Sequence, residues 1–372
     1  MGQLNLLQLR LSHFRSHRYT TIETDERPVV LHGPNGAGKT NILEAISLLS
    51  PGRGLRRSGP EDMARRQEAI GWKVNASLSG PGGLQEIETG SQDNATRSVQ
   101  IDGKPGSQLA LARTVRVLWL VPVMDRLWLE GAGDRRQFLD RIVMSFVPEH
   151  GDASLSYEKA MRERNRLLKD QVDDRGWFDA LEGQMATAGA AIVLNRTKTL
   201  ARLAQAQNGA QTAFPMAELS IAYPEDTPPE WSQDALRTAL ANSRSRDMAA
   251  GRSLVGPHRA DLNAIYAAKN VAARLCSTGE QKALLVSLIL ANARALIEDF
   301  AAPPILLLDE IAAHLDGERR SALYDEVCSL KAQAWMTGTG PELFEPLSRR
   351  AQWFSVREGA DGSEVLREEN NA

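Results

Sequence analysis

The chain has 372 residues, enough for two domains or for one large domain with an insertion. Hydrophobic residues make up 42% and charged residues 24%, a balance typical of a globular protein and not of a disordered or membrane-embedded one. The formal net charge of -3 argues against a protein that coats nucleic acid through overall basicity, so any nucleic-acid surface must be a local basic patch.

Cysteine use and apolar runs indicate the compartment. The two cysteines, Cys276 and Cys328, and the six scattered histidines give neither a disulfide framework nor a zinc-ligand spacing. The longest apolar runs, "VLWLVPVM" and "ILLLDEIAA", are too short to span a bilayer, which takes about 20 helical residues. We therefore expect a cytoplasmic protein with no membrane partner.

The pattern along the chain predicts two αβ portions flanking a helical insert. Residues 3–32 and 70–121 alternate in the manner of strands, and "IDGKPG" predicts a hairpin with Asp102 and Gly103 in its turn. Residues 133–246 carry apolar residues at helical intervals, and the strand-like pattern resumes at Arg252. The expected domains are an N-terminal part at 1–125, a helical lobe at 126–252 and a C-terminal part at 253–372.

The stretch "GPNGAGKT", residues 33–40, follows the apolar run of residues 29–31 and precedes a helical pattern that begins near Lys39. It matches the phosphate loop G-x-x-x-x-G-K-[ST] at every fixed position. Glycines let backbone N–H groups face an anion, the lysine reaches the β- and γ-phosphates, and the threonine is a Mg²⁺ ligand. The alternative is a chance glycine-rich turn. The expected ATP-binding residues are Gly33, Pro34, Asn35, Gly36, Ala37, Gly38, Lys39, Thr40 and Asn41.

Two acidic residues follow the apolar run Ile305–Leu308, which predicts a buried central strand. A carboxylate at the C-terminal end of such a strand faces the crevice beside the phosphate loop. We expect Asp309 to hold Mg²⁺ with Thr40, and Glu310 to position the attacking water, so that Lys39, Asp309 and Glu310 form the catalytic set. The alternative is an acid-rich helix N-terminus of a common kind.

The stretch "STGEQKALLVSLILANA" predicts a long apolar helix that begins after Ser277. Glu280 stands three residues later and completes a capping box. A well-capped core helix is the simpler interpretation. However, this cap followed by a helix and an acidic strand resembles the order found in ABC-type ATPases. That resemblance implies that Ser277, Gly279 and Glu280 contact the γ-phosphate bound to a second copy, and that Asp316 lies in a loop between subunits.

Three groups of ABC-type proteins share these parts. Transporter subunits usually carry a glutamine loop and a switch histidine, and "WLVPVMDRLWLEG" and "WMTGTG" have neither at the expected place. SMC-like proteins carry coiled coils hundreds of residues long, whereas the insert here is short. The sequence resembles the RecF family best, through "LSHFRSHRYTTIE", "GPNGAGKTNILEAI", "DRRQFLDRIV", "RNRLLK", "VGPHRADL" and "LLLDEIAAHLD". It departs from that family's usual Ser-Pro-Glu-Asp-Leu type loop after residue 121.

The resemblance implies a P-loop α/β ATPase head of ABC type with an inserted, mostly helical lobe. It also implies ATP-driven dimerisation on gapped or duplex DNA, slow ATP hydrolysis used as a switch, and cooperation with RecO and RecR in loading RecA. One alternative is an ABC-type subunit that energises a non-DNA partner complex, such as a transporter. Another is a passive nucleotide-sensing scaffold.

Basic residues provide candidate DNA contacts. The first cluster follows the phosphate-loop helix and is our preferred site, because it lies near the face where ATP closes a dimer. Two further clusters fall at residues 135–141 and 162–169. The alternative for each cluster is a solvated helix face. Three residues before the phosphate loop, Phe14, Arg15 and His17, are candidates for covering the adenine or are structural. The preferred DNA-binding residues are Arg53, Arg56, Arg57, Arg65 and Arg66.

Overall fold

The computed structural model describes residues 3–65, 68, 70–92, 96–224 and 230–368. The chain divides into two compact units, each continuous in space but not in sequence. Unit 1 comprises Met1–Asp125, Gly209–Met216 and Ser277–Ala372, and unit 2 comprises Arg126–Asn208 and Ala217–Cys276. The second unit therefore extends past the predicted boundary at residue 252.

One sheet of unit 1 is antiparallel, with strand order β2-β1-β4-β5-β6-β7. Along β4 the buried and less buried residues alternate, because one face of the sheet covers the core. The predicted turn at Asp102 and Gly103 joins β6 to β7, and both residues have the positive φ, 50° and 72°, that a tight hairpin turn requires. The strands are β1 (Asn5–Phe14), β2 (His17–Glu23), β4 (Trp72–Gly80), β5 (Gly83–Ser91), β6 (Ser98–Ile101) and β7 (Lys104–Gly106).

The second sheet of unit 1 has the order β15-β14-β3-β13-β12-β8. Its strands pair in parallel from β14 to β8, and β15 pairs antiparallel to β14 at the edge. Every residue of β8, β12 and β13 is buried, which is why these segments are continuous apolar runs and not alternating ones. The strands are β3 (Val29–His32), β8 (Val117–Leu120), β12 (Ile305–Leu308), β13 (Ala334–Gly338), β14 (Gln352–Gly359) and β15 (Gly362–Glu368).

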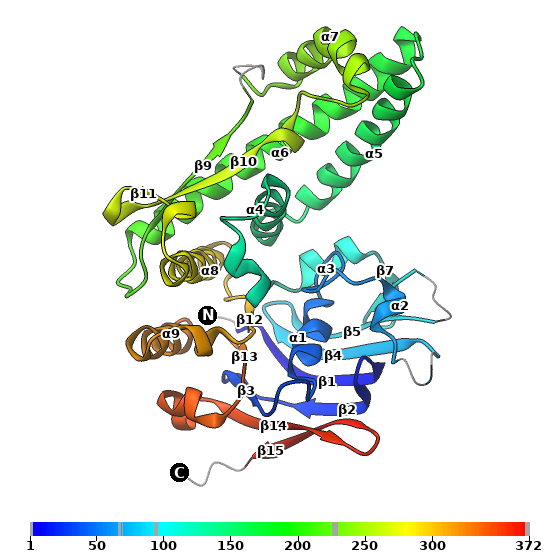
Figure 1. Cartoon of the computed structure of the whole chain (residues 1–372). Helices are drawn as coiled ribbons and strands as arrows, with labels where there is room; N and C mark the ends of the chain where they lie inside the picture. Colours follow the sequence, from blue (N-terminus) through cyan, green and yellow to red (C-terminus); the bar gives the residue numbers. More distant parts are fainter. Residues whose placement is uncertain (1–2, 66–67, 69, 93–95, 225–229, 369–372) are drawn as a thin grey trace. The chain divides into compact units, whose positions relative to one another are not determined.

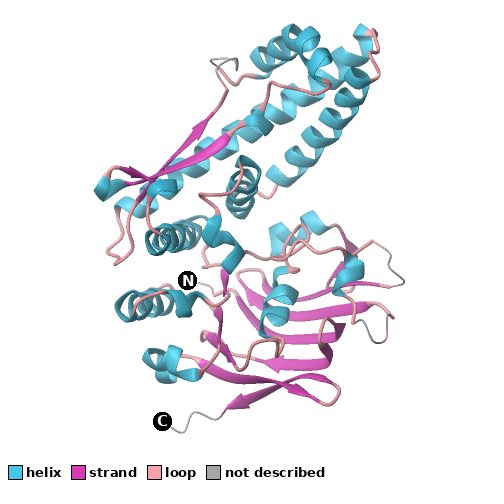
Figure 2. Cartoon of the chain, in the orientation of Figure 1, coloured by secondary structure: helices cyan, strands magenta, loops and turns pink. Residues whose placement is uncertain are grey.

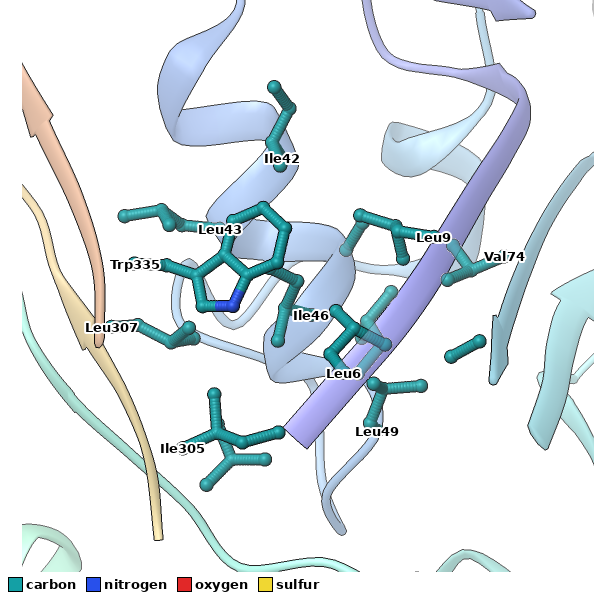
Figure 3. Packing of buried hydrophobic residues seen from close by; sticks show 14 of the residues in the cluster. Leu6, Leu9, Ile42, Leu43, Ile46, Leu49, Val74, Ile305, Leu307 and Trp335 are labelled. Carbon is teal, nitrogen blue, oxygen red and sulfur yellow. The ribbon is translucent and has the colours of Figure 1, made fainter. Parts of the chain in front are cut away.

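Helix α1 (Lys39–Ser47) lies between the two sheets, and Figure 3 shows its apolar side chains meeting both. Because α1 is covered on both sides, seven of its nine residues are buried, including all four apolar ones. The phosphate loop is thereby attached to the most buried helix of unit 1. The labelled core residues are Ile42, Leu43, Ile46 and Leu49 of the α1 region, Leu6, Leu9 and Val74 of the antiparallel sheet, and Ile305, Leu307 and Trp335 of the parallel sheet.

The other helices of unit 1 cover the sheets or connect strands (Figure 1). Helix α8 follows Ser277 and packs against β8. Its side chains from Gln281 to Ala293 are all buried. The elements are α2 (Pro60–Met63), α3 (Gln108–Thr114), α8 (Thr278–Phe300), α9 (Gly317–Ser329) and the 3-10 segments η1 (Pro122–Arg126), η5 (Ile311–His314) and η6 (Pro341–Arg350).

Unit 2 is built on the helices α5 and α6, which pack side by side, with α7 against α6 (Figure 2). A small antiparallel sheet of order β11-β10-β9 lies along α6. The elements of unit 2 are α4 (Ala132–Phe146), α5 (His150–Lys169), α6 (Arg175–Asn208), β9 (Ala217–Ala222), α7 (Gln233–Ala250), η2 (Pro257–Arg259), β10 (Asp261–Tyr266), η3 (Ala267–Lys269), β11 (Val271–Ala272) and η4 (Ala273–Leu275).

Two predictions about this region were wrong. Strand β9 lies inside the stretch 133–246, for which helices and no strand were predicted. Residues 253–276 belong to unit 2, because β10 pairs with β9 over six residue pairs and so joins them to the helical lobe. None of the helices formed by the described residues has the length and apolar character needed to cross a bilayer.

Candidate nucleotide-binding site

The phosphate loop joins the end of β3 to the start of α1 and lies against the β14–β15 hairpin. Gly33 has φ of 143°, and a Cβ on it would collide with the carbonyl oxygen of Val356. Gly38, at the N-cap of α1, has φ of 108°, and a Cβ there would collide with the Ser363 hydroxyl. Both positions therefore require glycine. The N-terminus of α1 and its unpaired N–H groups point into the loop, where they favour an anion.

Lys39 is buried in the loop, with its side chain only 5% exposed. Its ammonium group donates to the carbonyl oxygens of Gly33 at 2.6 Å and Pro34 at 2.8 Å. Burial lowers the pKa of Lys39, and the carboxylates of Glu310 and Asp309 act in the opposite direction. The ammonium thus lies where the phosphates of a bound nucleotide would receive its charge.

Thr40, Asp309 and Thr337 form a hydrogen-bonded group beside the loop. The Thr40 hydroxyl donates to Asp309 Oδ1 at 3.0 Å, and the Thr337 hydroxyl donates to the same oxygen at 2.7 Å. Thr337 was not singled out in the sequence; it belongs to β13, the strand next to β12. Two hydroxyl groups hold the buried carboxylate of Asp309 in place, and its negative charge is directed at the phosphate loop.

The oxygens of Thr40 and Asp309 suit Mg²⁺, which prefers hard oxygen ligands and usually takes one or two from the protein and the rest from phosphates and water. The described residues contain no group of three or more His, Cys, Asp or Glu side chains that could hold a metal alone. A cation at this place would therefore depend on the nucleotide, as expected for MgATP.

Glu310 has an unusual backbone for a residue with a side chain. Its φ of 52° and ψ of 20° lie in the left-handed region, which non-glycine residues enter rarely and at a cost of about 1 kcal/mol. Its N–H donates to the Thr337 hydroxyl at 2.9 Å, which ties it to the same network as Asp309. The chain thus turns sharply between β12 and η5, directly after Asp309.

The cap of α8 has the predicted capping box. The Ser277 hydroxyl accepts from the N–H of Glu280, and a Glu280 carboxylate oxygen accepts from the N–H of Ser277 at 2.8 Å. Ser277 and Thr278 are exposed, whereas the helix is buried from Gln281 onward. Asp316 is also exposed and caps α9 through the N–H of Arg319. The N-terminus of α8 is thus exposed, with the Glu280 carboxylate bound to Ser277.

The three candidates for covering the adenine all have partners inside unit 1. Phe14 is fully buried and packs edge-to-face on Trp72. Arg15 makes two hydrogen bonds to the buried carboxylate of Glu44. His17 is fully buried and lies between Thr20 and the carbonyl oxygen of Gly38. These contacts favour the structural alternative for all three residues.

We predict that His17 makes the stability of unit 1 depend on pH. Burial lowers its pKa from 6.5 to about 4. Because the folded pKa lies below the unfolded one, the unfolded state binds the proton more readily, and stability falls as pH drops from about 6.5 to 4. The contribution lost between pH 7 and pH 5 is about 2 kcal/mol.

Urea unfolding of the wild type and of His17→Gln at several pH values checks this expectation. Other groups also titrate, so the readout is the difference in the free energy of unfolding between the two proteins. That difference should narrow as the pH falls to 5. A gap that stays constant would contradict the buried, neutral imidazole.

The basic loop that follows α1 (residues 51–59) is tied back to that helix. Arg56 donates to Asn41 Oδ1 at 2.7 Å and to Glu44 Oε2 at 2.9 Å. Arg97, which the sequence did not single out, donates to the carbonyl oxygens of Leu48 and Gly52. The loop is thus attached to the helix that starts in the phosphate loop.

The predicted DNA contacts differ in exposure. Arg53, Arg56 and Arg57 are exposed in the basic loop. Arg65 is 8% exposed and donates to the carbonyl oxygen of Asp361 at 2.5 Å. Arg66 lies outside the described residues. In the cluster at 162–169, Arg164 is fully buried between Glu182 and Asp247 in unit 2, which makes it a packing residue.

The strand order of the parallel sheet, with the phosphate loop after β3 and the acidic pair after β12, separated from β3 by β13, defines an ABC-type P-loop ATPase head. Residues 5–361 match the family model of the RecF/RecN/SMC N-terminal domain. The chain is 46% identical to the DNA replication and repair protein RecF of Mesorhizobium japonicum, over 97% of this chain and 98% of that protein. It is also 46% identical to RecF of Rhizobium rhizogenes, over 95% of this chain and 96% of that protein. The chain belongs to the RecF family.

Solved structures agree with this fold. A structure of the recombination mediator protein RecF with ATP, from the RecFOR pathway, has a TM-score of 0.83 at 23% identity and covers 99% of this chain and 100% of that one. The Smc head domain of Pyrococcus furiosus has a TM-score of 0.57 at 15% identity, and the match covers 99% of this chain and 97% of that one. The predicted ABC-type α/β head is thereby confirmed.

Proposed function

We propose that this protein binds DNA in an ATP-dependent manner and acts in recombinational repair and replication restart. The observation that carries the proposal is the attachment of the exposed basic loop to α1 through Asn41, Glu44 and Arg56. The helix that receives the nucleotide also holds the candidate DNA contact. The high identity to RecF proteins over nearly the full chain supports the same role.

Each polar residue of the site has a role in binding and hydrolysing ATP. Lys39 and the N–H groups at the start of α1 bind the β- and γ-phosphates, and Lys39 leaves its carbonyl partners to do so. Thr40 and Asp309 supply oxygen ligands for Mg²⁺, which when bound neutralises charge on the phosphates. Glu310 accepts a hydrogen bond from the attacking water and aligns it with the γ-phosphorus.

The exposed cap of α8 completes the site from a second copy. Ser277, Gly279 and Glu280 of one protomer face the γ-phosphate held by Lys39 of the other, because an exposed helix N-terminus favours an anion. Two ATP molecules thus join two copies. Slow hydrolysis removes the γ-phosphate and weakens the dimer, so ATP turnover acts as a switch.

The partners follow from the family. One solved relative is the recombination mediator protein RecF of the RecFOR pathway. We include RecO- and RecR-type mediators as partners of this protein, with gapped or duplex DNA as the site of action and loading of RecA as the outcome. A subunit that energises a non-DNA complex is the competing function, and it requires no ATP-dependent affinity for DNA.

The test reverses two exposed charges of the basic loop, Arg56→Glu and Arg57→Glu. We expect the double variant to bind gapped and duplex DNA at least tenfold more weakly in the presence of ATP, with a flatter dependence on salt, because each lost phosphate contact lowers the salt slope by about 1. Fluorescence anisotropy of a labelled oligonucleotide across a salt titration measures both quantities.

The matched control is Lys331→Glu with Arg350→Glu, which changes the charge equally at two exposed positions around α9. It should bind DNA as the wild type does. Equal affinity of the basic-loop variant and this control at every salt concentration would exclude the loop as a DNA contact. A wild type that binds DNA equally with and without ATP would refute the proposed function.

A further inference from the structure

The turn in "VGPHRAD" (residues 255–261) of unit 2 is held by buried polar groups that the ATP-binding site does not use. His258 Nδ1 lies 2.8 Å from the Tyr157 hydroxyl, and His258 Nε2 lies 3.1 Å from the carbonyl oxygen of Ser253. Gly256 has φ of 136°, and a Cβ on it would collide with the Tyr157 hydroxyl. This position therefore requires glycine, which lets the turn approach α5 closely.

Arginines from α4 and α6 hold the same turn from the other side. Arg196 donates to the carbonyl oxygen of Pro257 at 2.9 Å, and Arg136 donates to that of Ala260 at 2.6 Å. Arg135 makes a two-pronged ion pair with Asp261, at 2.7 and 2.9 Å. Backbone and side chains of the turn are thus fixed by elements far apart in the sequence.

Arg259 is the side chain that this turn presents to solvent. It is exposed, while Pro257 is buried and His258 is engaged with Tyr157. Within the part of the chain that the structure describes, the Arg259 guanidinium has no carboxylate within ion-pair distance. The backbone of this turn is pre-organised, so no backbone freedom is lost when the Arg259 guanidinium binds an anion.

The surroundings of Arg259 carry excess positive charge. Asp261 is paired with Arg135, and Asp140 is paired with Arg196 and also contacts His150. Among the described residues, Arg136 has a carbonyl partner and no carboxylate within ion-pair distance. Burial lowers the pKa of Arg136, and the positive charges of Arg196 and Arg259 lower it further.

His258 adds no charge to this surface near neutral pH, since its pKa is lowered to about 4, chiefly by burial. The negative charge of Asp134, in the first turn of α4, acts on Arg135 and raises its pKa. Among the described residues, Arg136 and Arg259 therefore contribute positive charge to this surface without a carboxylate within ion-pair distance.

We propose that Arg259, with Arg136 behind it, binds a phosphate of the DNA backbone and gives unit 2 its own DNA contact. This inference rests on the proposed function and extends it to a second unit. A guanidinium binds phosphate through two parallel hydrogen bonds. The surface reads no base, because a single guanidinium directed at a phosphate fixes position and carries no sequence information.

The test compares Arg259→Glu, Arg259→Ala and Arg259→Lys with the wild type, using labelled gapped and duplex oligonucleotides with ATP. One phosphate contact contributes about eightfold in affinity at ~0.1 M salt, because the binding constant scales with roughly the 0.9 power of salt concentration for each contact. We expect a loss of about that size for Arg259→Ala, a larger loss for Arg259→Glu, and a smaller one for Arg259→Lys. The salt slope should fall by about 1 for Arg259→Ala.

The matched control is Arg252→Glu, an exposed arginine of the same unit at the end of α7, which should leave DNA binding within twofold of the wild type. Thermal melting checks folding, and Arg259 variants should melt with the wild type because the side chain has no ion-pair partner to lose among the residues that the structure describes. The proposal would be overturned if Arg259→Ala and Arg259→Glu bound DNA with wild-type affinity across the salt range. A loss of binding to an acidic protein by the same variants would not change that conclusion. If the wild type itself shows no ATP-dependent DNA binding, the proposed function fails first and this contact fails with it.

Discussion

Replacing Glu310 by glutamine should slow ATP hydrolysis by about 10²- to 10⁴-fold, the usual contribution of a positioned base, while ATP binding persists. The amide keeps the size of the side chain, and the left-handed backbone and the hydrogen bond to Thr337 do not depend on the side-chain charge. The variant should therefore accumulate as an ATP-bound dimer. Phosphate release and size-exclusion chromatography with MgATP measure the two effects.

The control for this variant is Glu318→Gln, an exposed carboxylate in the first turn of α9. It should hydrolyse ATP at the wild-type rate and form no lasting dimer. Undiminished hydrolysis by Glu310→Gln would show that Glu310 does not position the attacking water. It would favour the alternative of a passive nucleotide-sensing scaffold.

Replacing Lys39 by alanine should lower ATP affinity by at least 100-fold, because the γ-phosphate loses a buried cation for which water cannot substitute inside the loop. The ammonium group already lies in the loop, 2.6 Å from the Gly33 carbonyl oxygen, and is 5% exposed. Isothermal titration calorimetry with ATP gives the affinity. The variant should also gain no thermal stability from added MgATP, since stabilisation by a ligand follows its binding.

Lys39→Arg separates charge from fit. It keeps the positive charge but places a larger, planar group between Gly33 and Pro34, and we expect most of the affinity to be lost. ATP affinity close to that of the wild type in Lys39→Ala would show that the loop binds nucleotide through its backbone alone.

The nucleotide site was predictable from the sequence where its parts are local. The phosphate loop, the strand before it and α1 after it are contiguous, so residues 29–47 contained the whole motif. The capping box at Ser277 and Glu280 spans four residues, and the apolar run Ile305–Leu308 is characteristic of a buried parallel strand.

Features that depend on distant pairing were not predictable in this way. Strand β9 is specified by its partner β10, some forty residues later, and its own sequence alternates too briefly to stand out. Thr337 reaches Asp309 because β13 lies beside β12, which only the sheet order establishes. The burial of Arg65 follows from its contact with Asp361, nearly three hundred residues away.

The central claim is that Lys39 of one copy and the Ser277 turn of another grip the same γ-phosphate. The most direct test mixes two variants, Lys39→Ala and Ser277→Arg, each of which should remain monomeric with MgATP when alone. In the mixed pair, one site joins the intact Lys39 of one copy to the intact Ser277 of the other, while the opposite site carries both defects. Sedimentation velocity of the mixture with MgATP and gapped DNA should then show a dimer. A mixture that sediments as monomers, while the wild type forms dimers, would contradict a site shared between two copies.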